Sequence, residues 1–195
     1  DLKRVCAHGM ARMHMRCGNL AQGLKIADRC GSKPLFRDCA AILESMKQWN
    51  EAGLMYEKAM MHDKAAQIYM AAKNYTEVAK LMAGLDNPKL LSEYGKAMEG
   101  LKKYKEALQA YQKSGDFDAQ VRILIEHLNA APEALALVRL HRMVSCAEFA
   151  AKFCQSQGDH RGCIEFLLLA KKPKAAMDVA RQHDLLDVLA QFLGD

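Results

Sequence analysis

Proline and aromatic residues are scarce in this sequence of 195 residues. It contains four prolines and one tryptophan, and aromatic residues make up 7% of it. Runs of β-branched residues are also few, whereas alanine, leucine, methionine and lysine, which all favour helix, are abundant. Hydrophobic residues make up 51% and charged residues 26%, a composition typical of a globular rather than a disordered chain. The sequence therefore predicts an almost wholly α-helical protein.

Long apolar segments are absent. The longest apolar runs, such as residues 166–170, are far too short to span a bilayer, so we predict no direct insertion into a membrane. No positively charged leader followed by an apolar stretch is present, and nothing indicates secretion. Because the first residue is Asp1 and not an initiator methionine, we expect an internal segment of a longer protein.

The seven cysteines do not form the pattern of a disulfide framework, since their number is odd and they are widely scattered. Most occupy expected helix-core positions beside alanines and leucines, where a free cysteine behaves as a small hydrophobic residue. We therefore expect reduced thiols and a cytoplasmic-type compartment. The cysteines are Cys6, Cys17, Cys30, Cys39, Cys146, Cys154 and Cys163.

Motifs of catalytic and nucleotide-binding sites are also missing: there is no Walker-type phosphate loop, no GxGxxG and no HExxH pair. The strongest metal candidate combines Cys154, His160 and Cys163 with Cys146, ligand types that suit zinc, but their spacing matches no compact zinc module. A cysteine nucleophile paired with His141 or His160 would need both groups in one cleft, which the sequence does not indicate. We predict no enzyme activity, no bound metal or cofactor and no small-molecule substrate.

The net charge of +5 includes two lysine clusters, within residues 102–105 and 171–174, both at expected turns between helices. We interpret them as solvated surface, and the alternative is a contact with an acidic partner or with membrane headgroups. A nucleic-acid site would need basic residues on one face with interleaved aromatic residues. The aromatic residues instead occupy repeat positions, described next, so no nucleic-acid partner is predicted.

A short motif recurs along the chain. A small or polar pair precedes a bulky anchor residue, and a small residue follows three positions later, as in Lys47–Ala52 and Lys102–Ala107. Most anchors are 13 residues apart and the others 29 or 30, which predicts stacked short helices of about ten residues. The anchors are Leu20, Trp49, His62, Tyr75, Tyr104, Phe117, Ala130, His160, Pro173 and Leu186.

The residue types of the motif suit helix packing. A small residue where two antiparallel helices cross allows their axes to approach to roughly 8–10 Å. A bulky anchor one turn earlier would fill the gap between successive hairpins, and a second ring lies one or two turns further along the same face. Helices this short are marginal alone in water, so they must be stabilised by their neighbours. The predicted packing residues are Trp49, Ala52, Tyr56, Ala65, Tyr69, Tyr75, Tyr104, Ala107, Tyr111 and Phe117.

About fourteen helices and no strand are expected. We predict one continuous domain over residues 1–195, a right-handed α-solenoid of short antiparallel TPR-like hairpins without an internal boundary. Methionines fill the core of such a fold or make an adaptable binding surface. Core filling is the favoured interpretation, although Met10, Met13 and Met15 near the start would also suit a contact with a neighbouring segment.

Several ordered segments of the chain resemble one family. The similarity is strongest from Cys39 onward, where residues 39–52 and 56–59 are similar to the TPR-like helical region of the WD40/TPR subunits of intraflagellar transport complex A. The resemblance covers most of the chain, but residues 130–150 depart from the repeat spacing. Further matching segments are residues 63–66, 97–100, 104–107, 127–129, 157–159 and 182–183.

The resemblance implies a non-catalytic scaffold segment that mediates protein contacts in retrograde ciliary transport and in the ciliary entry of membrane proteins. It implies other complex A subunits and neighbouring copies in the train as partners, on the cytoplasmic side of the cilium at the axoneme and basal body. It supplies no catalytic residues. Two alternatives are a coatomer-like vesicle-coat α-solenoid and a TPR adaptor that binds an acidic peptide tail through the lysine clusters.

Overall fold

The computed structural model describes residues 2–194, which form fourteen α-helices and one 3₁₀ turn and, within that range, no strand. The prediction of an all-α chain built from short antiparallel hairpins is thereby confirmed. Contacts between residues divide the chain into two units that meet in the sequence between Leu101 and Lys102. Each unit is a run of helices in which most neighbours along the sequence also pack together.

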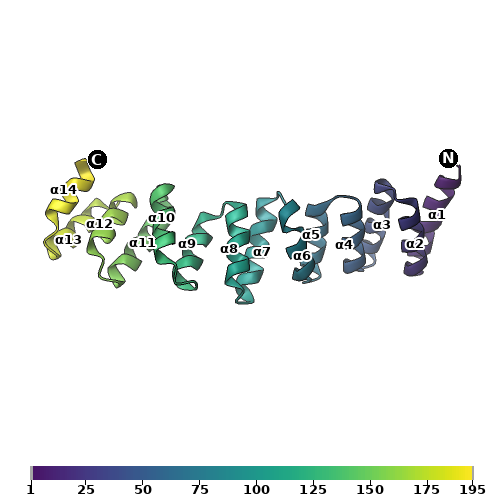
Figure 1. Ribbon diagram of the computed structural model, residues 1–195, viewed down its shortest axis with the longest axis horizontal. Coiled ribbons are helices and arrows are strands. Elements are labelled where there is room, and N and C mark those ends of the chain that lie inside the picture. The colour runs from purple at the N-terminus through teal and green to yellow at the C-terminus, as the bar shows by residue number, and fades with distance from the viewer. Residues whose placement is uncertain (1, 195) are drawn as a thin grey trace. The chain divides into compact units, whose positions relative to one another are not determined.

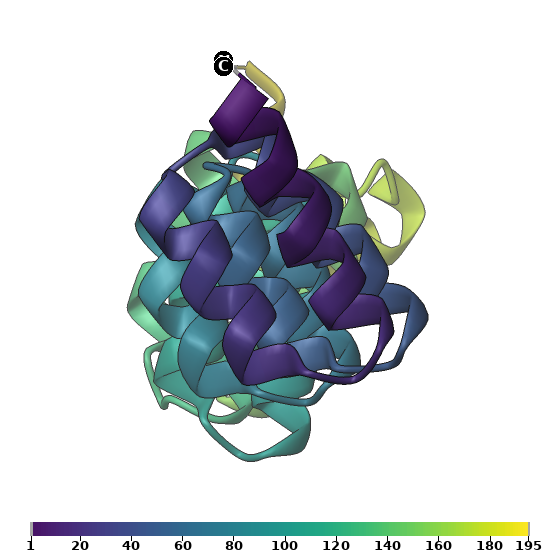
Figure 2. The same cartoon turned by 90° about the vertical axis from the view of Figure 1, so that its right-hand side faces the viewer.

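In the first unit each helix from α1 to α5 packs against the next helix along the chain (Figure 1). The helix α1 contacts both α2 and α3, and α5 contacts both α6 and α7. Figure 2 shows α1 and α2 as an antiparallel pair. The helices are α1 (Leu2–Arg16), α2 (Leu20–Cys30), α3 (Lys33–Ser45), α4 (Trp49–Lys58), α5 (His62–Ala71), α6 (Tyr75–Leu81) and α7 (Pro88–Gly100), with the 3₁₀ turn at Met82–Gly84.

The second unit repeats this arrangement. Contacts join α8 to α9, α9 to α10 and α11, and α12 to α11, α13 and α14. Its helices are α8 (Tyr104–Ser114), α9 (Phe117–Glu126), α10 (Ala131–Leu140), α11 (Val144–Ser156), α12 (His160–Leu169), α13 (Pro173–Gln182) and α14 (Leu186–Gly194).

The same type of backbone turn recurs at most connections between helices. The residue two positions before the next helix is left-handed, with φ of 81° at Gly18 and 60° at Lys47. The N–H of the following residue, as at Gln48, donates to a carbonyl five residues earlier, that of Leu43, over 2.9 Å. This bonding is typical of a Schellman helix end. Residues in this position are Gly18, Gly31, Lys47, Met60, Lys73, Lys102, Gly115, Arg142, Gly158, Lys171 and Asp184.

The turn explains the repeated motif. Nine of the ten anchors are the first residue of a helix, and the two residues before each of these anchors form the turn. The exception is Ala130: the left-handed residue there is Asn129, and α10 begins one position later, at Ala131. The repeat spacing is thus shifted by one residue at α10, whereas the turn at Arg142, before α11, is regular. The single continuous domain and the right-handed superhelix remain predictions.

Candidate protein-interaction surfaces

The small residues of the motif lie at buried positions. Ala52, Ala65 and Ala107 have no exposed surface, and Ala176 in α13 is equally buried. An alanine at such a position leaves room for the neighbouring helix, because its side chain ends at the Cβ atom. That these alanines set the spacing of the helices remains a prediction.

The second rings of the motif are buried and two of them bind carboxylates. Tyr56, Tyr69 and Tyr111 are each less than about 5% exposed. The Tyr56 hydroxyl donates a hydrogen bond of 2.7 Å to Glu44, and the Tyr69 hydroxyl donates one of 2.7 Å to Glu57. Burial, and then the bond to the carboxylate, raises the pKa of each phenol. Buried phenols usually need such a partner, so each pair joins two successive helices of the first unit.

The aromatic anchors are only half-buried. Each is the first residue of its helix and keeps part of its surface exposed. The loss on truncation is therefore smaller than the roughly 3–5 kcal/mol expected for a fully buried ring. The anchors are Trp49 in α4, Tyr75 in α6, Tyr104 in α8 and Phe117 in α9.

Some anchors stack on a histidine in a later turn. The rings of Tyr104 and His127 lie 4.1 Å apart and within 9° of parallel, and Phe117 lies 4.3 Å from His141. These contacts were not predicted from the sequence, although a histidine 23 or 24 residues after the anchor is a visible signal. A third pair is His160 with His183, at 3.4 Å.

Two glycines lie at close helix contacts: Gly23 was expected from the sequence as a small residue at a helix crossing, whereas Gly53 was not. A Cβ atom at Gly53 would lie 2.6 Å from Cζ of Tyr69, so the Tyr69 ring packs directly on this backbone. A Cβ atom at Gly23 would lie 3.1 Å from the carbonyl oxygen of Ala11, between α1 and α2. These glycines, adjacent to or part of the repeated motif, allow approaches that an alanine would obstruct.

The candidate metal and nucleophile residues do not form a site. Cys146, Cys154 and Cys163 lie in one apolar core cluster of the second unit, whereas His160 stacks on His183. Residues 2–194 contain no group of three or more potential ligands suited to a metal ion.

The buried thiols are also poorly suited to nucleophilic chemistry. Burial, followed by a 2.7 Å hydrogen bond to Asp118, raises the pKa of Cys146 to about 12. Burial is likewise the main reason that the pKa of Cys154 is raised, to about 11. An activated cysteine needs the opposite shift, because the thiolate is the nucleophile.

Ion pairs connect successive hairpins. Arg139 donates two hydrogen bonds of 2.8 Å to Glu165, which lies 26 residues later. Arg12 is paired over 3.2 Å with Asp38, also 26 residues later. In both pairs, an arginine at a helix contact is neutralised by an acidic side chain on another helix. Further pairs of this kind are Lys58 with Asp28, Lys64 with Glu44, and Lys172 with Glu148.

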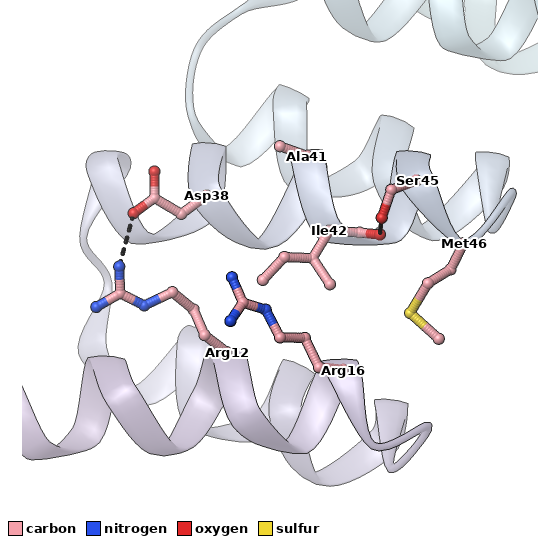
Figure 3. A pocket seen from close by; sticks show the side chains of 7 residues that line it. All are labelled: Arg12, Arg16, Asp38, Ala41, Ile42, Ser45 and Met46. Carbon is pink, nitrogen blue, oxygen red and sulfur yellow. Dashed lines mark hydrogen bonds and ion pairs between the residues drawn. The ribbon is translucent and has the colours of Figure 1, made fainter.

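A groove of about 450 Å³ lies between α1 and α3. Figure 3 shows the guanidinium groups of Arg12 and Arg16 extending from α1 towards α3. Arg12 reaches Asp38, whereas Arg16 lies near the side chain of Ile42. The groove is lined by Arg12, Arg16, Asp38, Ala41, Ile42, Ser45 and Met46.

A second groove, of about 540 Å³, lies in the second unit. Arg142 and Lys171, both in left-handed turns, line it together with the apolar side chains of Val144, Leu168 and Phe192. The lysine clusters named from the sequence are at turns, as expected, except that Lys105 and Lys174 lie in the first turns of α8 and α13, and part of each cluster is paired. Lys103 contacts Glu106, and Lys172 contacts Glu148.

None of the helices within residues 2–194 is both long and apolar enough to cross a membrane.

The comparisons with known proteins agree on one family. The model of the TPR domain of intraflagellar transport proteins 140 and 172 matches residues 8–193. The chain is 37% identical over 190 residues to WD repeat-containing protein 19 of Mus musculus and 36% identical over 190 residues to that of Homo sapiens. It is 37% identical over 189 residues to WD repeat-containing protein dyf-2 of Caenorhabditis elegans. Each alignment covers 97% of this chain and 14% of the relative.

These matches confirm the resemblance drawn from the sequence and the TPR-like character of the solenoid. The chain spans about 14% of the length of these relatives, so it corresponds to one helical segment of much longer proteins. A solved structure of Pseudomonas aeruginosa pilF, 15% identical over 97% of this chain and 88% of its own, superposes with a TM-score of 0.38, which carries no functional argument.

Proposed function

Because this chain belongs to the family defined by the TPR domain of intraflagellar transport proteins 140 and 172, we propose that it is a non-catalytic scaffold segment of an intraflagellar transport complex A subunit. The observation that carries this proposal is the family match over residues 8–193, together with 37% identity to WD repeat-containing protein 19 over 97% of the chain. In this role the segment mediates protein contacts for retrograde ciliary transport and for the entry of membrane proteins into the cilium.

The arrangement of the helices supports a role in protein association. Helices of about ten residues depend on their neighbours for stability, so the core of a helical repeat runs between layers and leaves an extended surface for partners. The candidate nucleophiles are buried thiols with raised pKa values, which favours binding over catalysis.

The proposed partners are other complex A subunits and neighbouring copies of the assembly in a transport train. The proposed location is the cytoplasmic side of the cilium, at the axoneme and basal body. Grooves between helices with arginine and apolar side chains, such as those at Arg16 and Arg142, have the composition of protein interfaces.

Proximity labelling of the full-length protein in ciliated cells tests this function. We expect the labelled neighbours to include other complex A subunits at the basal body and axoneme. Labelling confined to Golgi coat components would instead support the vesicle-coat alternative. Salt-sensitive binding of a peptide with a free acidic C-terminus, lost when the lysines of residues 102–105 are replaced by glutamine, would support a peptide-binding adaptor.

A further inference from the structure

Arg16 has no neutralising partner within the part of the chain that the structure describes. Its neighbour on α1, Arg12, is paired with Asp38 over 3.2 Å, and Arg37 on α3 also contacts Asp38. One carboxylate therefore serves two other guanidinium groups, while Arg16 extends into the groove beside Ile42 (Figure 3). The guanidinium N–H groups of an arginine can donate charge-assisted, bidentate hydrogen bonds to a carboxylate.

The spacing of two other arginine pairs shows where an acidic partner of Arg16 would be expected. Arg12 and Arg139 each contact an acidic residue 26 positions later. The residue 26 positions after Arg16 is Ile42, which cannot neutralise it. The chain thus supplies the basic half of the same helix-to-helix ion pair without the acidic half.

The charge around this groove is strongly basic. Residues 2–45 contain eight Lys and Arg and three Asp and Glu, an excess of five, which equals the net charge of +5 of the whole chain. The helix α1 has no acidic residue among Leu2–Arg16. An acidic partner is therefore attracted more to the first three helices than to the remainder of the chain, where basic and acidic residues are equal in number.

Exposed apolar side chains also lie on α1, the helix that carries the two arginines. Met15 is fully buried, so it fills the core, whereas Met10 and Met13 are 47% and 56% exposed on α1. Val5 on the same helix is 67% exposed. Exposed methionines and arginines together are typical of interface surfaces, and the spacing of Val5 and Met13 places them on one face of the helix.

We propose that the groove between α1 and α3 binds a glutamate or aspartate side chain carried by an amphipathic helix of a partner protein, with Arg16 as the main donor. The inference rests on the proposed scaffold function and names the chemistry of one partner. The occupant is a helix because the chain itself neutralises its arginines with acids on adjacent helices. The apolar residues of the partner helix pack against Met13 and Ile42 while its carboxylate accepts hydrogen bonds from Arg16.

Two peptides test the proposal directly on this chain. The first is a fluorescein-labelled helical peptide with leucine on one face and glutamate on its borders, and the second carries glutamine at every glutamate position. We expect the glutamate peptide to bind at least about tenfold more tightly in fluorescence anisotropy, as a charge-assisted hydrogen bond predicts. Equal binding of the two peptides overturns the proposal.

Substitutions in the groove should act in opposite directions. Arg16→Gln is expected to weaken the glutamate peptide about tenfold, while Arg142→Gln, a matched loss of one charge in the groove of the second unit, leaves its affinity unchanged. Asp38→Asn should strengthen binding, because it frees Arg12 and removes a like charge from the approach of the carboxylate. A general loss of folding cannot produce this increase. No change with Arg16→Gln overturns the proposal.

Two other occupants have distinct outcomes. Binding of phosphatidylserine vesicles that is lost in Arg16→Gln, without glutamate-peptide binding, would show a membrane surface instead. A dimer in sedimentation that Arg16→Gln disrupts, again without peptide binding, would show a second copy of the chain. Either result overturns the proposal.

In ciliated cells, full-length protein with Arg16→Gln should lose proximity labelling of at least one neighbour and retain the others. Unchanged labelling of every neighbour overturns this inference and leaves the scaffold function intact. Failure of the unmodified protein to label any complex A subunit overturns the scaffold function, whereas the peptide measurements still decide the chemistry of the groove.

Discussion

The phenol of Tyr56 on α4 donates a hydrogen bond of 2.7 Å to the carboxylate of Glu44 on α3, and the same pair recurs 13 residues later as Tyr69 and Glu57. The bond to Tyr56 is the main reason that the pKa of Glu44 is lowered, with a further contribution from Lys64. The carboxylate is therefore stabilised in its charged form, and the pair contributes to folding most when Glu44 is ionised.

Removing this hydroxyl should reduce stability in a pH-dependent way. Tyr56→Phe is expected to lower the free energy of unfolding by about 1 kcal/mol near neutral pH, since the bond is partly exposed to solvent. Because the pKa of Glu44 is lower in the folded state, its contribution is present above its ordinary pKa of 4.5 and is lost as the pH falls through the folded value. Urea unfolding at pH 7 and in the acid range measures the difference.

The control for this pair is Glu44→Gln, alone and with Tyr56→Phe. The double variant should lose less than the sum of the two single variants, because Tyr56→Phe removes the bond and Glu44→Gln removes the charge that strengthens it. A Tyr56→Phe effect that is equally large below the folded pKa of Glu44 would contradict the electrostatic explanation.

The backbone of Gly53 makes the close contact with the ring of Tyr69 that a side chain would block. Gly53→Ala should destabilise the chain, because overpacking costs roughly 1–3 kcal/mol and exceeds the gain of about 1 kcal/mol from helix propensity. Thermal unfolding measured by circular dichroism gives the net effect. Gly9→Ala is the matched control: its Cβ would meet no atom within 4 Å, so this substitution should stabilise α1. A stabilising Gly53→Ala would show that Tyr69 moves away freely.

The left-handed turns predict opposite effects of glycine and alanine. Lys73 has a φ of 56°, so Lys73→Gly relieves an unfavourable conformation and should be neutral or stabilising by up to about 1 kcal/mol. Gly115 has a φ of 72° and open space around its Cα, so Gly115→Ala should cost about 1 kcal/mol through the backbone alone. Chemical denaturation of both variants tests the turn. If Lys73→Gly destabilised the chain by more than about 1 kcal/mol, which is the usual entropic cost of a glycine, the lysine side chain would have a role of its own.

The stack of Tyr104 on His127 should be measurable as a coupling energy. A double-mutant cycle with Tyr104→Ala and His127→Ala is expected to give about 0.5–1.5 kcal/mol, the range of aromatic pairs. The reference cycle combines Tyr104→Ala with His141→Ala, since His141 instead contacts Phe117 and the two effects should add. Additivity in the first cycle would mean that the stack contributes nothing.

The sequence predicted the positions of the helices well because its signals are local. A turn residue, a cap and an anchor lie within a few positions of one another, so nine anchors coincide with the first residues of helices. At Asn87 the side chain accepts a hydrogen bond from the N–H of Lys89, and Pro88 follows at the helix start, as the order of these residues indicates.

The sequence could not give contacts that depend on how distant segments pack. His127 stacks on Tyr104, and Tyr69 packs on Gly53. Both contacts depend on how the helices cross and not on local spacing. Trp49 is half-buried because it begins its helix, so Trp49→Ala should cost less than the value for a core ring. The groove at Arg16 was also missed, since sequence analysis directed attention to lysine clusters and not to isolated arginines.

The recurring turn is held by main-chain hydrogen bonds, and glycine, lysine, methionine, arginine and aspartate all occupy its left-handed position. The backbone geometry of each turn therefore does not depend on which side chain projects from its left-handed position. Mutation can reverse the charge of a corner for a modest conformational cost and leave the helices on either side in place. A protein built this way can exchange one binding partner for another, corner by corner, while its fold stays the same.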